Sequence, residues 1–260
     1  MRIVRFMANN EARYGILDDQ DRIQSLKGPP YDGVETDGEL FRLSEVELLA
    51  PCEPSKIIGV GLNYRDHAEE LGLELPKEPM LFLMPDTAVI GPGQTIRLPE
   101  RSERVDYEGE LGVVIGRPAF RIQKEAAADY ILGYTCFNDV TARDLQIMDT
   151  QFTRSKGFDT FAPIGPWIVT DVDPGCLDIE TYVNGTRRQG SNTRQLLFDP
   201  CYLVHFVSWV MTLKPGDVIA SGTPAGIGPI ESGDRVEIRI QGVGSLINEV
   251  AFWGKGPVGP

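Results

Sequence analysis

The chain has 260 residues, 42% of them hydrophobic, so it can bury the core of one large domain or two modest ones. Its formal net charge of −13 works against binding to a nucleic-acid backbone or an anionic membrane surface, because such partners require basic patches. No apolar run approaches the roughly 20 residues needed to cross a bilayer, and we expect neither nucleic acid nor a membrane as a partner.

The first fifty residues alternate short β-like runs with polar, Gly and Pro turns, and they predict a small β-rich domain without helices. The segment "APCEPSK" holds two prolines and leads into the apolar run "KIIGVGL". We therefore expect domains at residues 1–52 and 53–260. The initial segment "MRIVRFMANN" lacks the apolar stretch of a secretion signal, and we expect the protein in the cytoplasm.

The middle of the chain predicts strands interrupted by short helices. "NYRDHAEELG" has a helix-forming composition and ends at Gly72, which favours a left-handed helix stop. Strand-like runs follow at "MLFLM" and "VDYEGELGVVIG". "KEAAADYI" then predicts a helix, "LGYTCFND" a strand and "TARDLQIM" another helix.

The last part of the chain predicts hairpins and one packed helix. Asn184 and Gly185 lie between two extended runs and predict a tight hairpin turn. "FDPCYLVHFVSWVM" predicts a helix that begins near Asp199 and Pro200, and "DVIASGT", "RVEIRIQG" and "SLINEV" predict strands. Because strands outnumber helices and occur in hairpins, we expect an α+β fold that is mainly β, mixed and largely antiparallel.

Two carboxylates, Glu108 and Glu110, lie two positions apart in "VDYEGELGVV". Side chains at this spacing leave the same face of an extended chain. Two acidic residues in an acidic protein ordinarily lie on a solvated strand face. Their neighbours here are those of a buried strand, where carboxylates need a compensating cation or metal. Asp139 ends the strand-like run "GYTCFND" and supplies a third carboxylate.

The residue types restrict the kind of metal site. The four cysteines show no CxxC spacing, which argues against a thiolate zinc site or a disulfide framework and favours buried free thiols: Cys52, Cys136, Cys176 and Cys201. Only two histidines are present, so a metal must be bound mainly by oxygen. Glu108, Glu110 and Asp139 suit a hard divalent ion such as Mg²⁺ or Mn²⁺.

Four long blocks of the sequence resemble successive blocks of the fumarylacetoacetate hydrolase family, in order, over most of residues 56–250. They are "DYEGELGVVIGR", "GYTCFNDVTARDLQ", "FTRSKGFDTFAPIGPWIVT" and "LKPGDVIASGTPAGIG". The resemblance implies a β-roll-like mixed fold, Mg²⁺ or Mn²⁺ held by Glu108, Glu110 and Asp139, and a homodimer. It also implies chemistry on small 2-oxo acids or their enols through an enolate whose charge must be stabilised.

The resemblance also gives roles to residues that would otherwise be ordinary. By its sequence context alone, Lys156 would be a surface lysine. The resemblance implies instead a catalytic group that anchors a substrate carboxylate or moves a proton, helped by a lowered pKa. Arg143 and Gln146, which otherwise suit a helix surface, would face the substrate. Thr223 in "SGTPAGIG" would contact the ligand, whereas no GxxxxGK[ST] or GxGxxG spacing supports a phosphate loop.

His67 and Glu70 lie three positions apart in a predicted helix, so they can reach each other or a shared water. The segment "NYRDHAEE" resembles the family's mobile lid, in which such a pair activates water, although a lone histidine on a short helix is more often structural. His205 lies among large apolar residues and is interpreted as a core histidine without a catalytic role.

The function favoured by these features is that of an isomerase or decarboxylase of aromatic catabolism, similar to the bacterial 2-hydroxyhepta-2,4-diene-1,7-dioate isomerases and 5-carboxymethyl-2-oxohex-3-ene-1,7-dioate decarboxylases. The alternative enzymes are an acylpyruvate hydrolase or an oxaloacetate decarboxylase, which the pair of His67 and Glu70 keeps open. A metal-bound ligand sensor or structural dimer without turnover is a different class, in which Lys156 and the lid pair would be unnecessary.

Overall fold

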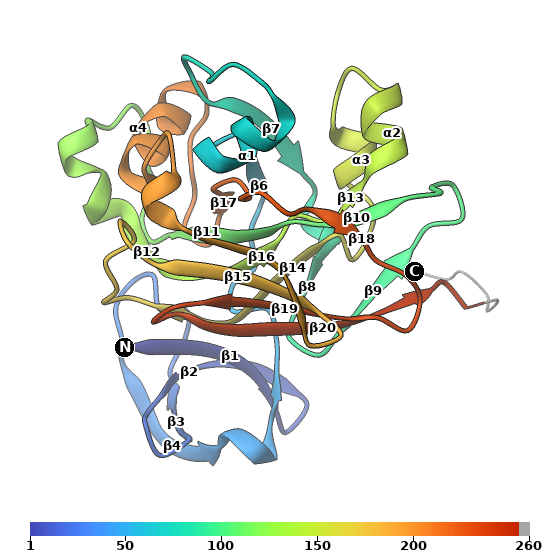
Figure 1. The fold of residues 1–260 in the computed structure, drawn as a ribbon. Coiled ribbons are helices and arrows are strands. Elements are labelled where there is room, and N and C mark those ends of the chain that lie inside the picture. Colours follow the sequence, from blue (N-terminus) through green and yellow to red (C-terminus); the bar gives the residue numbers. More distant parts are fainter. Residues whose placement is uncertain (255–260) are drawn as a thin grey trace.

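The computed structural model describes residues 1–254, and β-strands dominate this part of the chain (Figure 1). In the described part of the chain, three sheets form the fold, with twelve, five and three strands. The α-helices gather at one end of the sheets, and the N-terminal domain lies at the opposite end (Figure 1). The predicted α+β fold, mainly β and mixed, is confirmed.

The N-terminal domain is a small antiparallel sheet without an α-helix, as predicted. Its elements are β1 (Arg2–Ala8), β2 (Glu11–Leu17), β3 (Arg22–Leu26), β4 (Thr36–Arg42), the 3-10 turn η1 (Leu43–Glu45) and β5 (Glu47–Leu48). On the side away from β2, residues Arg2 and Ile3 of β1 pair with β14 (Ala162–Val169). The twelve-stranded sheet therefore continues from this domain into the rest of the chain.

The remainder of the large sheet consists of apolar strands. Beyond β14 it continues with β12 (Ile131–Asn138), β11 (Gly109–Ile115), β17 (Val218–Ala220), β6 (Ile57–Gly61) and the edge strand β7 (Met80–Met84), while β8 (Val89–Ile90) pairs with β14. Only the pairs β17–β6 and β14–β8 of this sheet are parallel among the described residues. Every residue of β11 is buried, because both faces of the strand are covered.

A second sheet packs on the first. It consists of β16 (Thr186–Asn192), β15 (Asp178–Val183), β19 (Arg235–Ile240), β20 (Gly244–Phe252) and β9 (Thr95–Leu98), and it packs against β11, β12 and β14. Leu111, Ile179 and Ile238 belong to the hydrophobic core that both sheets share. The predicted hairpin between β15 and β16 is confirmed, with positive φ angles at Asn184 and Gly185.

The helices are short. They are α1 (Arg65–Leu71), α2 (Arg143–Met148), α3 (Thr153–Lys156) and α4 (Pro200–Val210), with 3-10 turns η2 (Asp86–Ala88), η3 (Lys124–Tyr130) and η4 (Thr193–Gln195). As predicted, α1 stops at Gly72 in the left-handed region, and Asp199 caps α4 by accepting from the N–H of Tyr202. The helix predicted at "KEAAADYI" is a 3-10 helix instead. Only Ala127 of η3 is buried, so no apolar stripe stabilises a regular α-helix there.

The prediction of a single strand at "VDYEGELGVVIG" is wrong, because the strand breaks at Glu108. Its first part, β10 (Val105–Tyr107), pairs with β13 (Thr141–Ala142) and β18 (Gly228–Pro229), whereas β11 pairs with β12 and β17. Both parts have strand composition, so only the change of pairing partners reveals the break.

All four cysteines are free. Cys52 and Cys136 are buried as predicted, but Cys201 is half-buried and Cys176 is exposed. These two lie on α4 and in the turn before β15, where the chain faces solvent. No helix among residues 1–254 is long and apolar enough to span a membrane.

Candidate active site

The candidate site is a cavity of about 300 Å³ at the helical end of the sheets. Eight of the nine predicted site residues line it: His67, Glu108, Glu110, Asp139, Arg143, Gln146, Lys156 and Thr223. The ninth, Glu70, does not line the cavity but hydrogen-bonds to His67. The rest of the wall is largely apolar and includes Met80, Phe82 and Phe152.

Three carboxylates converge on the floor of the cavity. Glu108 lies at the break between β10 and β11, Glu110 is the second residue of β11, and Asp139 directly follows β12. The antiparallel register places Gly109 opposite Asn138, and the N–H of Asp139 donates to the carbonyl oxygen of Glu108 at 2.9 Å. One carboxylate oxygen from each residue lies within 4.8 Å of the other two, and all three side chains are buried.

Lys156, at the end of α3, lies among these carboxylates and is only 2% exposed. Its ammonium group donates to Glu108 Oε2 at 3.0 Å, to Asp139 Oδ2, and to the hydroxyl of Thr141 at 2.9 Å. The ammonium nitrogen also lies 5.0 Å from the ring centroid of Phe82. Lys156 is therefore a buried lysine and not a surface one, and its catalytic role stays a prediction.

Phe82 reaches the cavity across a glycine of the neighbouring strand. It pairs with Gly59 of β6, where an added Cβ would lie 2.1 Å from the Phe82 ring. The ring packs edge-on against Phe152, with their centroids 5.6 Å apart. The Phe82 ring covers one side of the buried Lys156 ammonium group, and low exposure to water strengthens the electrostatic interactions of this group.

Arg143, at the start of α2, holds a second set of acidic groups. It donates from Nε to Asp106 Oδ2 at 2.9 Å, from Nη2 to Glu108 Oε1, and from Nη1 to the side-chain oxygen of Gln146. Asp106 is fully buried and also accepts from Arg104. Arg143 therefore lines the cavity, but much of its donor capacity is used inside the protein.

Burial and neighbouring charges shift the pKa values of the three carboxyl groups in different directions. Burial, followed by the charges of Asp139 and Glu108, raises the pKa of Glu110 well above its usual range. Burial also raises the pKa of Asp139 to about 6, although Lys156 opposes this shift. Burial disfavours the charge of Glu108 too, but Lys156 and Arg143 outweigh it and lower the pKa of Glu108 to about 2.

The predicted lowering of the Lys156 pKa is wrong in this structure. Burial by itself would lower it, but the charges of Asp139 and Glu108 outweigh burial and raise the pKa of Lys156. The sequence could not show this, because the partners of Lys156 lie 17 and 48 positions away in the chain.

The donor set fits a divalent cation. Among residues 1–254, four buried carboxylates, those of Asp106, Glu108, Glu110 and Asp139, pair with the buried Lys156 and the partly buried Arg143, and Asp106 also pairs with the exposed Arg104. Glu110 has no ion pair among residues 1–254, and Asp139 Oδ1 is buried without a hydrogen-bond partner there. A hard ion bound by these oxygens would balance the charge and satisfy the unpaired oxygen.

The loop after β17 closes the floor of the cavity. The N–H of Gly222 donates to Glu110 Oε2 at 2.7 Å, and the hydroxyl of Thr223 donates to the carbonyl oxygen of Gly109 at 2.9 Å. Thr223 therefore lies beside the carboxylates, although 114 positions separate it from Gly109.

Helix α1 covers the cavity and carries His67 on its inner side. His67 Nδ1 and Glu70 Oε2 are 2.9 Å apart, and Glu70 Oε1 accepts from the N–H of Gly226 at 3.1 Å. The second contact ties α1 to the loop that carries Thr223. By contrast, His205 lies in α4 outside the cavity lining, where its Nδ1 contacts the carbonyl oxygen of Ile122 at 2.8 Å. It is half-buried rather than a core residue as predicted, because one side of α4 faces solvent.

Sequence reasoning missed two polar residues around the site, Asp106 and Thr141. Asp106 continues the period-two series that includes Glu108 and Glu110, so the alternation itself was a signal for it. Thr141 carried no such signal, since its role depends on its contact with Lys156.

Two family models match the chain. The model described as fumarylacetoacetate (FAA) hydrolase, C-terminal, matches residues 56–251, and the model described as Rv2993c-like, N-terminal, matches residues 1–51. A protein of Archaeoglobus fulgidus is 58% identical to this chain over 229 residues, which cover 85% of this chain and 92% of that protein.

Solved structures agree with these matches. The structure of 2-hydroxyhepta-2,4-diene-1,7-dioate isomerase from Mycobacterium marinum is 44% identical, has a TM-score of 0.91, and covers 98% of this chain and 100% of its own. Maleylpyruvate hydrolase from Sphingobium sp. SYK-6, solved in complex with manganese(II) and pyruvate, is 30% identical, with a TM-score of 0.80 and coverage of 98% and 100%.

Proposed function

This chain belongs to the fumarylacetoacetate hydrolase family, and from that premise we propose that it is a divalent-metal-dependent enzyme acting on small 2-oxo acids or their enols. The observation that carries the proposal is the convergence of Glu108, Glu110 and Asp139 beside a buried lysine in one cavity. In this proposal the three carboxylates hold Mg²⁺ or Mn²⁺. The manganese in the related maleylpyruvate hydrolase structure supports this choice of ion.

In the proposed reaction, the cation site, Lys156 and the polar lining residues would each have a different role. A bound divalent cation would supply a Lewis acid for a reaction that develops charge on a carbonyl oxygen. Lys156 remains protonated at neutral pH, so it would bind a substrate carboxylate or donate a proton. Gln146, Arg143 and Thr223 line the cavity with polar groups that would orient a small diacid.

We propose isomerisation or decarboxylation of a hydroxy-dienoate or 2-oxo diacid, of the kind found in aromatic catabolism, as the first reaction to test. Similarity to the isomerase from Mycobacterium marinum supports it. Acylpyruvate hydrolysis or oxaloacetate decarboxylation is the second candidate, because His67 and Glu70 form a pair that can activate water above the carboxylates.

The test is a panel of 2-oxo diacids, their enols and acylpyruvates, assayed for diene absorbance and pyruvate release. Each assay is run with Mg²⁺, with Mn²⁺ and after chelation, and the Glu110→Gln variant serves as the control for the metal site. We expect turnover of at least one substrate that requires the metal. Metal-independent turnover, or none across the whole panel, would contradict the proposal.

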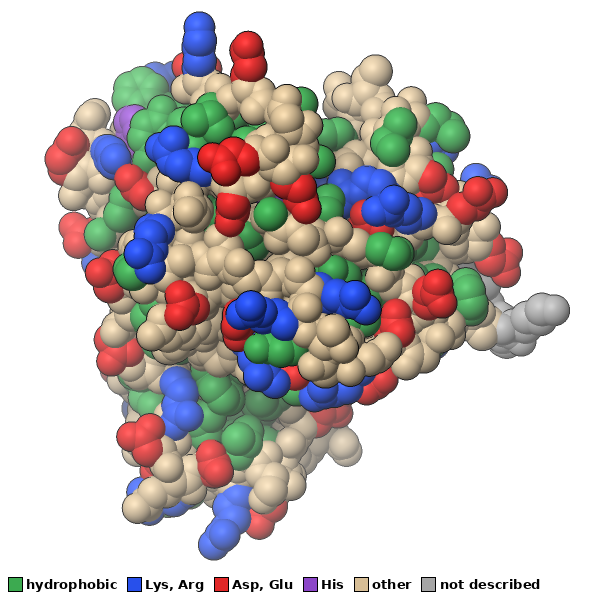
Figure 2. All heavy atoms as spheres, in the orientation of Figure 1, with side chains coloured by type: hydrophobic (Ala, Val, Ile, Leu, Met, Phe, Trp, Pro, Cys, Tyr) green, Lys and Arg blue, Asp and Glu red, His purple; other side chains and the backbone are tan. Residues whose placement is uncertain are grey.

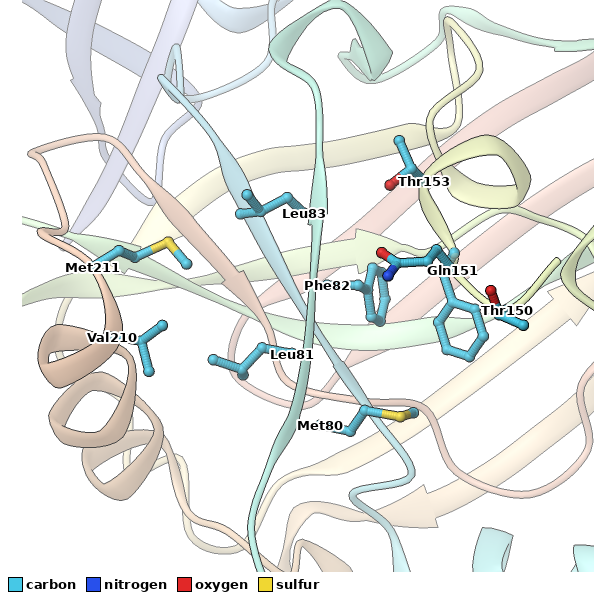
Figure 3. A pocket seen from close by; sticks show the side chains of 10 residues that line it. Met80, Leu81, Phe82, Leu83, Thr150, Gln151, Thr153, Val210 and Met211 are labelled. Atoms are coloured by element: carbon cyan, nitrogen blue, oxygen red, sulfur yellow. The ribbon is translucent and has the colours of Figure 1, made fainter.

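We also propose that the protein is a homodimer that pairs through the edge strand β7. A groove of about 490 Å³ runs along β7, between the end of α4 and the loop before α3 (Figure 3). In Figure 3, Leu81 and Leu83 point towards Val210 and Met211, and Phe82 lies towards Gln151. None of the residues lining this groove is charged, although 24% of the chain is charged.

A second copy of the chain is the occupant that this groove fits best. Two chains with a net charge of −13 each repel one another, and an uncharged contact surface adds no close contacts between like charges to this repulsion. Figure 2 shows acidic and basic side chains interspersed over one face, with hydrophobic side chains gathered over α4. The outer edge of β7 is unpaired within residues 1–254, and Met80, Phe82 and Phe152 line both the groove and the cavity. A partner in the groove would therefore support one wall of the active site.

Light scattering on Leu83→Glu tests this interface. Leu83 is 45% exposed in the groove, and Leu40→Glu in β4, where Leu40 is 68% exposed, is the matched control. We expect the wild type and Leu40→Glu to have the mass of two chains and Leu83→Glu that of one. A dimeric Leu83→Glu variant would exclude β7 as the interface, and a monomeric wild type would exclude the dimer.

A further inference from the structure

Gln189 lies behind the cavity and bonds to two of the segments that form it. It belongs to β16, is 1% exposed and does not line the cavity. Its side-chain oxygen accepts from the N–H of Gly109 at 3.0 Å and from the Thr181 hydroxyl at 2.7 Å. Its Nε2 donates to Thr223 Oγ1 at 2.9 Å and to the carbonyl oxygen of Pro224 at 2.8 Å. The amide therefore uses both acceptor positions and both donors.

The two segments joined by this amide carry different parts of the site. Gly109 separates Glu108 from Glu110, and Thr223 belongs to the loop whose Gly222 N–H binds Glu110. The Thr223 hydroxyl returns a hydrogen bond to the carbonyl oxygen of Gly109, which closes a ring through Gln189. Gln189 therefore adds a side-chain link between the carboxylate segment and the loop, beside their direct hydrogen bonds.

The glycine between the two glutamates is a consequence of this arrangement. A Cβ at Gly109 would lie 2.3 Å from Thr181 Oγ1 and 3.3 Å from Gln189 Oε1. Thr181 and Gln189 are direct cross-strand partners in β15 and β16, so the pair approaches Gly109 as a unit. Only a residue without a side chain allows the amide to reach the backbone between the glutamates.

We propose that Gln189 is a positioning residue that sets the spacing between the cation-binding carboxylates and Thr223. This spacing determines whether a cation and the carboxylate of a 2-oxo acid can be bound side by side. The inference rests on the proposed function. If the Gln189 amide had only a structural role, its replacement would lower stability alone. If it positions the site, its replacement also weakens the binding of the ion and of a carboxylate ligand.

Calorimetry on Gln189→Met tests the proposal, because methionine keeps the length of the side chain and removes all four hydrogen bonds. Mn²⁺ is titrated first, followed by oxalate, whose adjacent carboxylates resemble a 2-oxo carboxylate. The matched control is Asn248→Leu in β20. Asn248 is a buried amide that donates to the carbonyl oxygens of Gly91 and Gln94, away from the cavity.

We expect Gln189→Met to weaken the binding of both Mn²⁺ and oxalate by about 10-fold and by no more than about 100-fold, because Gln189 acts on the backbone beside the carboxylates and not on the carboxylates themselves. Asn248→Leu should lower the melting temperature to a similar degree and leave both dissociation constants within about twofold of wild type. The positioning role would be overturned if both variants lost the same number of degrees in melting temperature and Gln189→Met kept the dissociation constants of the wild type.

A milder variant covers the case in which Gln189→Met does not fold. Thr181→Val removes only the hydroxyl that orients the amide, and we expect it to weaken oxalate binding by about threefold. Unchanged oxalate binding in Thr181→Val would then overturn the role. A wild type that binds no Mn²⁺ would overturn the proposed function as well, so the two failures are distinguishable.

Discussion

Glu110 is the carboxylate of the site with the least compensation for its charge. Its side chain is buried and accepts one hydrogen bond within residues 1–254, from the Gly222 N–H, and Asp139 and Glu108 repel it. In the proposed function a divalent cation balances this charge. The same group should then be necessary for activity and unfavourable for the stability of the metal-free protein.

We expect Glu110→Gln to reduce turnover by at least about 100-fold, since a Lewis acid contributes several kcal/mol and 1.4 kcal/mol corresponds to tenfold in rate. The change conserves volume, so the fold should be retained, and the melting temperature of the metal-free protein should rise by a few degrees. Asp139→Asn should also abolish activity. Calorimetric Mn²⁺ titration and thermal unfolding are the measurements, and undiminished affinity and turnover in both variants would exclude the metal assignment.

The pH dependence of the metal-free protein follows from the same groups. A raised carboxyl pKa means that the folded state holds its proton more tightly than the unfolded chain does, which stabilises the fold at low pH. This contribution is complete below the unfolded pKa and is lost as the pH rises through the folded pKa, about 6 for Asp139 and higher for Glu110. The free energy of unfolding should therefore fall as the pH rises from about 4 through about 6, and less steeply in Glu110→Gln.

In the proposed function Lys156 would serve every reaction of the site, because it contacts two of the three carboxylates. We expect Lys156→Met to lower kcat/KM by about 10²- to 10⁴-fold on every substrate, the range of general acid–base groups. Lys124→Met is the matched control, since Lys124 is an exposed lysine paired with Asp199. Near-wild-type rates in Lys156→Met would leave this lysine with a structural role only.

At the scale of elements, the site depends on where strands and helices end. The break between β10 and β11 turns Glu108 towards the cavity, and Asp139 follows the last residue of β12. Helix α1 covers these carboxylates and is fastened to the Thr223 loop through Glu70. A short helix held by few contacts can move as a unit, which suits the predicted role of a lid.

The contribution of α1 can be separated from that of the carboxylates with His67→Ala. Hydrolysis and decarboxylation need a positioned base or a closed lid, whereas ketonisation of an enol needs only the cation site and a proton carrier. We expect His67→Ala to remove most hydrolysis or decarboxylation and to leave ketonisation within about tenfold of wild type, or about 1.4 kcal/mol.

Enol absorbance and pyruvate release, followed in parallel, measure the two activities of His67→Ala. His205→Ala is the control, since this second histidine lies outside the cavity. Equal losses of both signals would assign His67 to a step that the reactions share.

At the scale of the whole molecule, the N-terminal domain and the rest of the chain share a sheet and a core. Ile3 of β1 is fully buried, pairs with Ile168 of β14, and packs in a cluster that includes Phe137 and Ile164. The division into residues 1–52 and 53–260 stays a prediction. The shared core leads us to expect that the two parts unfold together.

Ile3→Ala tests this cooperation. We expect it to lower the free energy of unfolding by about 2–5 kcal/mol, the usual cost of such a core truncation, within a single calorimetric transition. Leu40→Ala is the exposed control and should change the free energy by less than about 0.5 kcal/mol. Mn²⁺ affinity should not change in either variant. Two transitions, of which Ile3→Ala shifts only one, would show that the domains unfold independently.

Features that depend on neighbouring residues were predictable from the sequence. Asn184 and Gly185 form the expected turn because each tolerates positive φ, and α4 begins at Asp199 because a carboxylate can cap free N–H groups. The two-residue spacing of Glu108 and Glu110 likewise predicted that both side chains would point to one region.

Only the tertiary structure decided the features that depend on distant partners. The strand breaks at Glu108 because its two sides pair in different sheets, and the pKa of Lys156 rises because α3 carries it between Glu108 and Asp139. Gln189 lies 80 positions from Gly109 and had no signal in its own neighbourhood. Strand order and register determine such contacts, and these follow from the packing of the whole chain rather than from local preference.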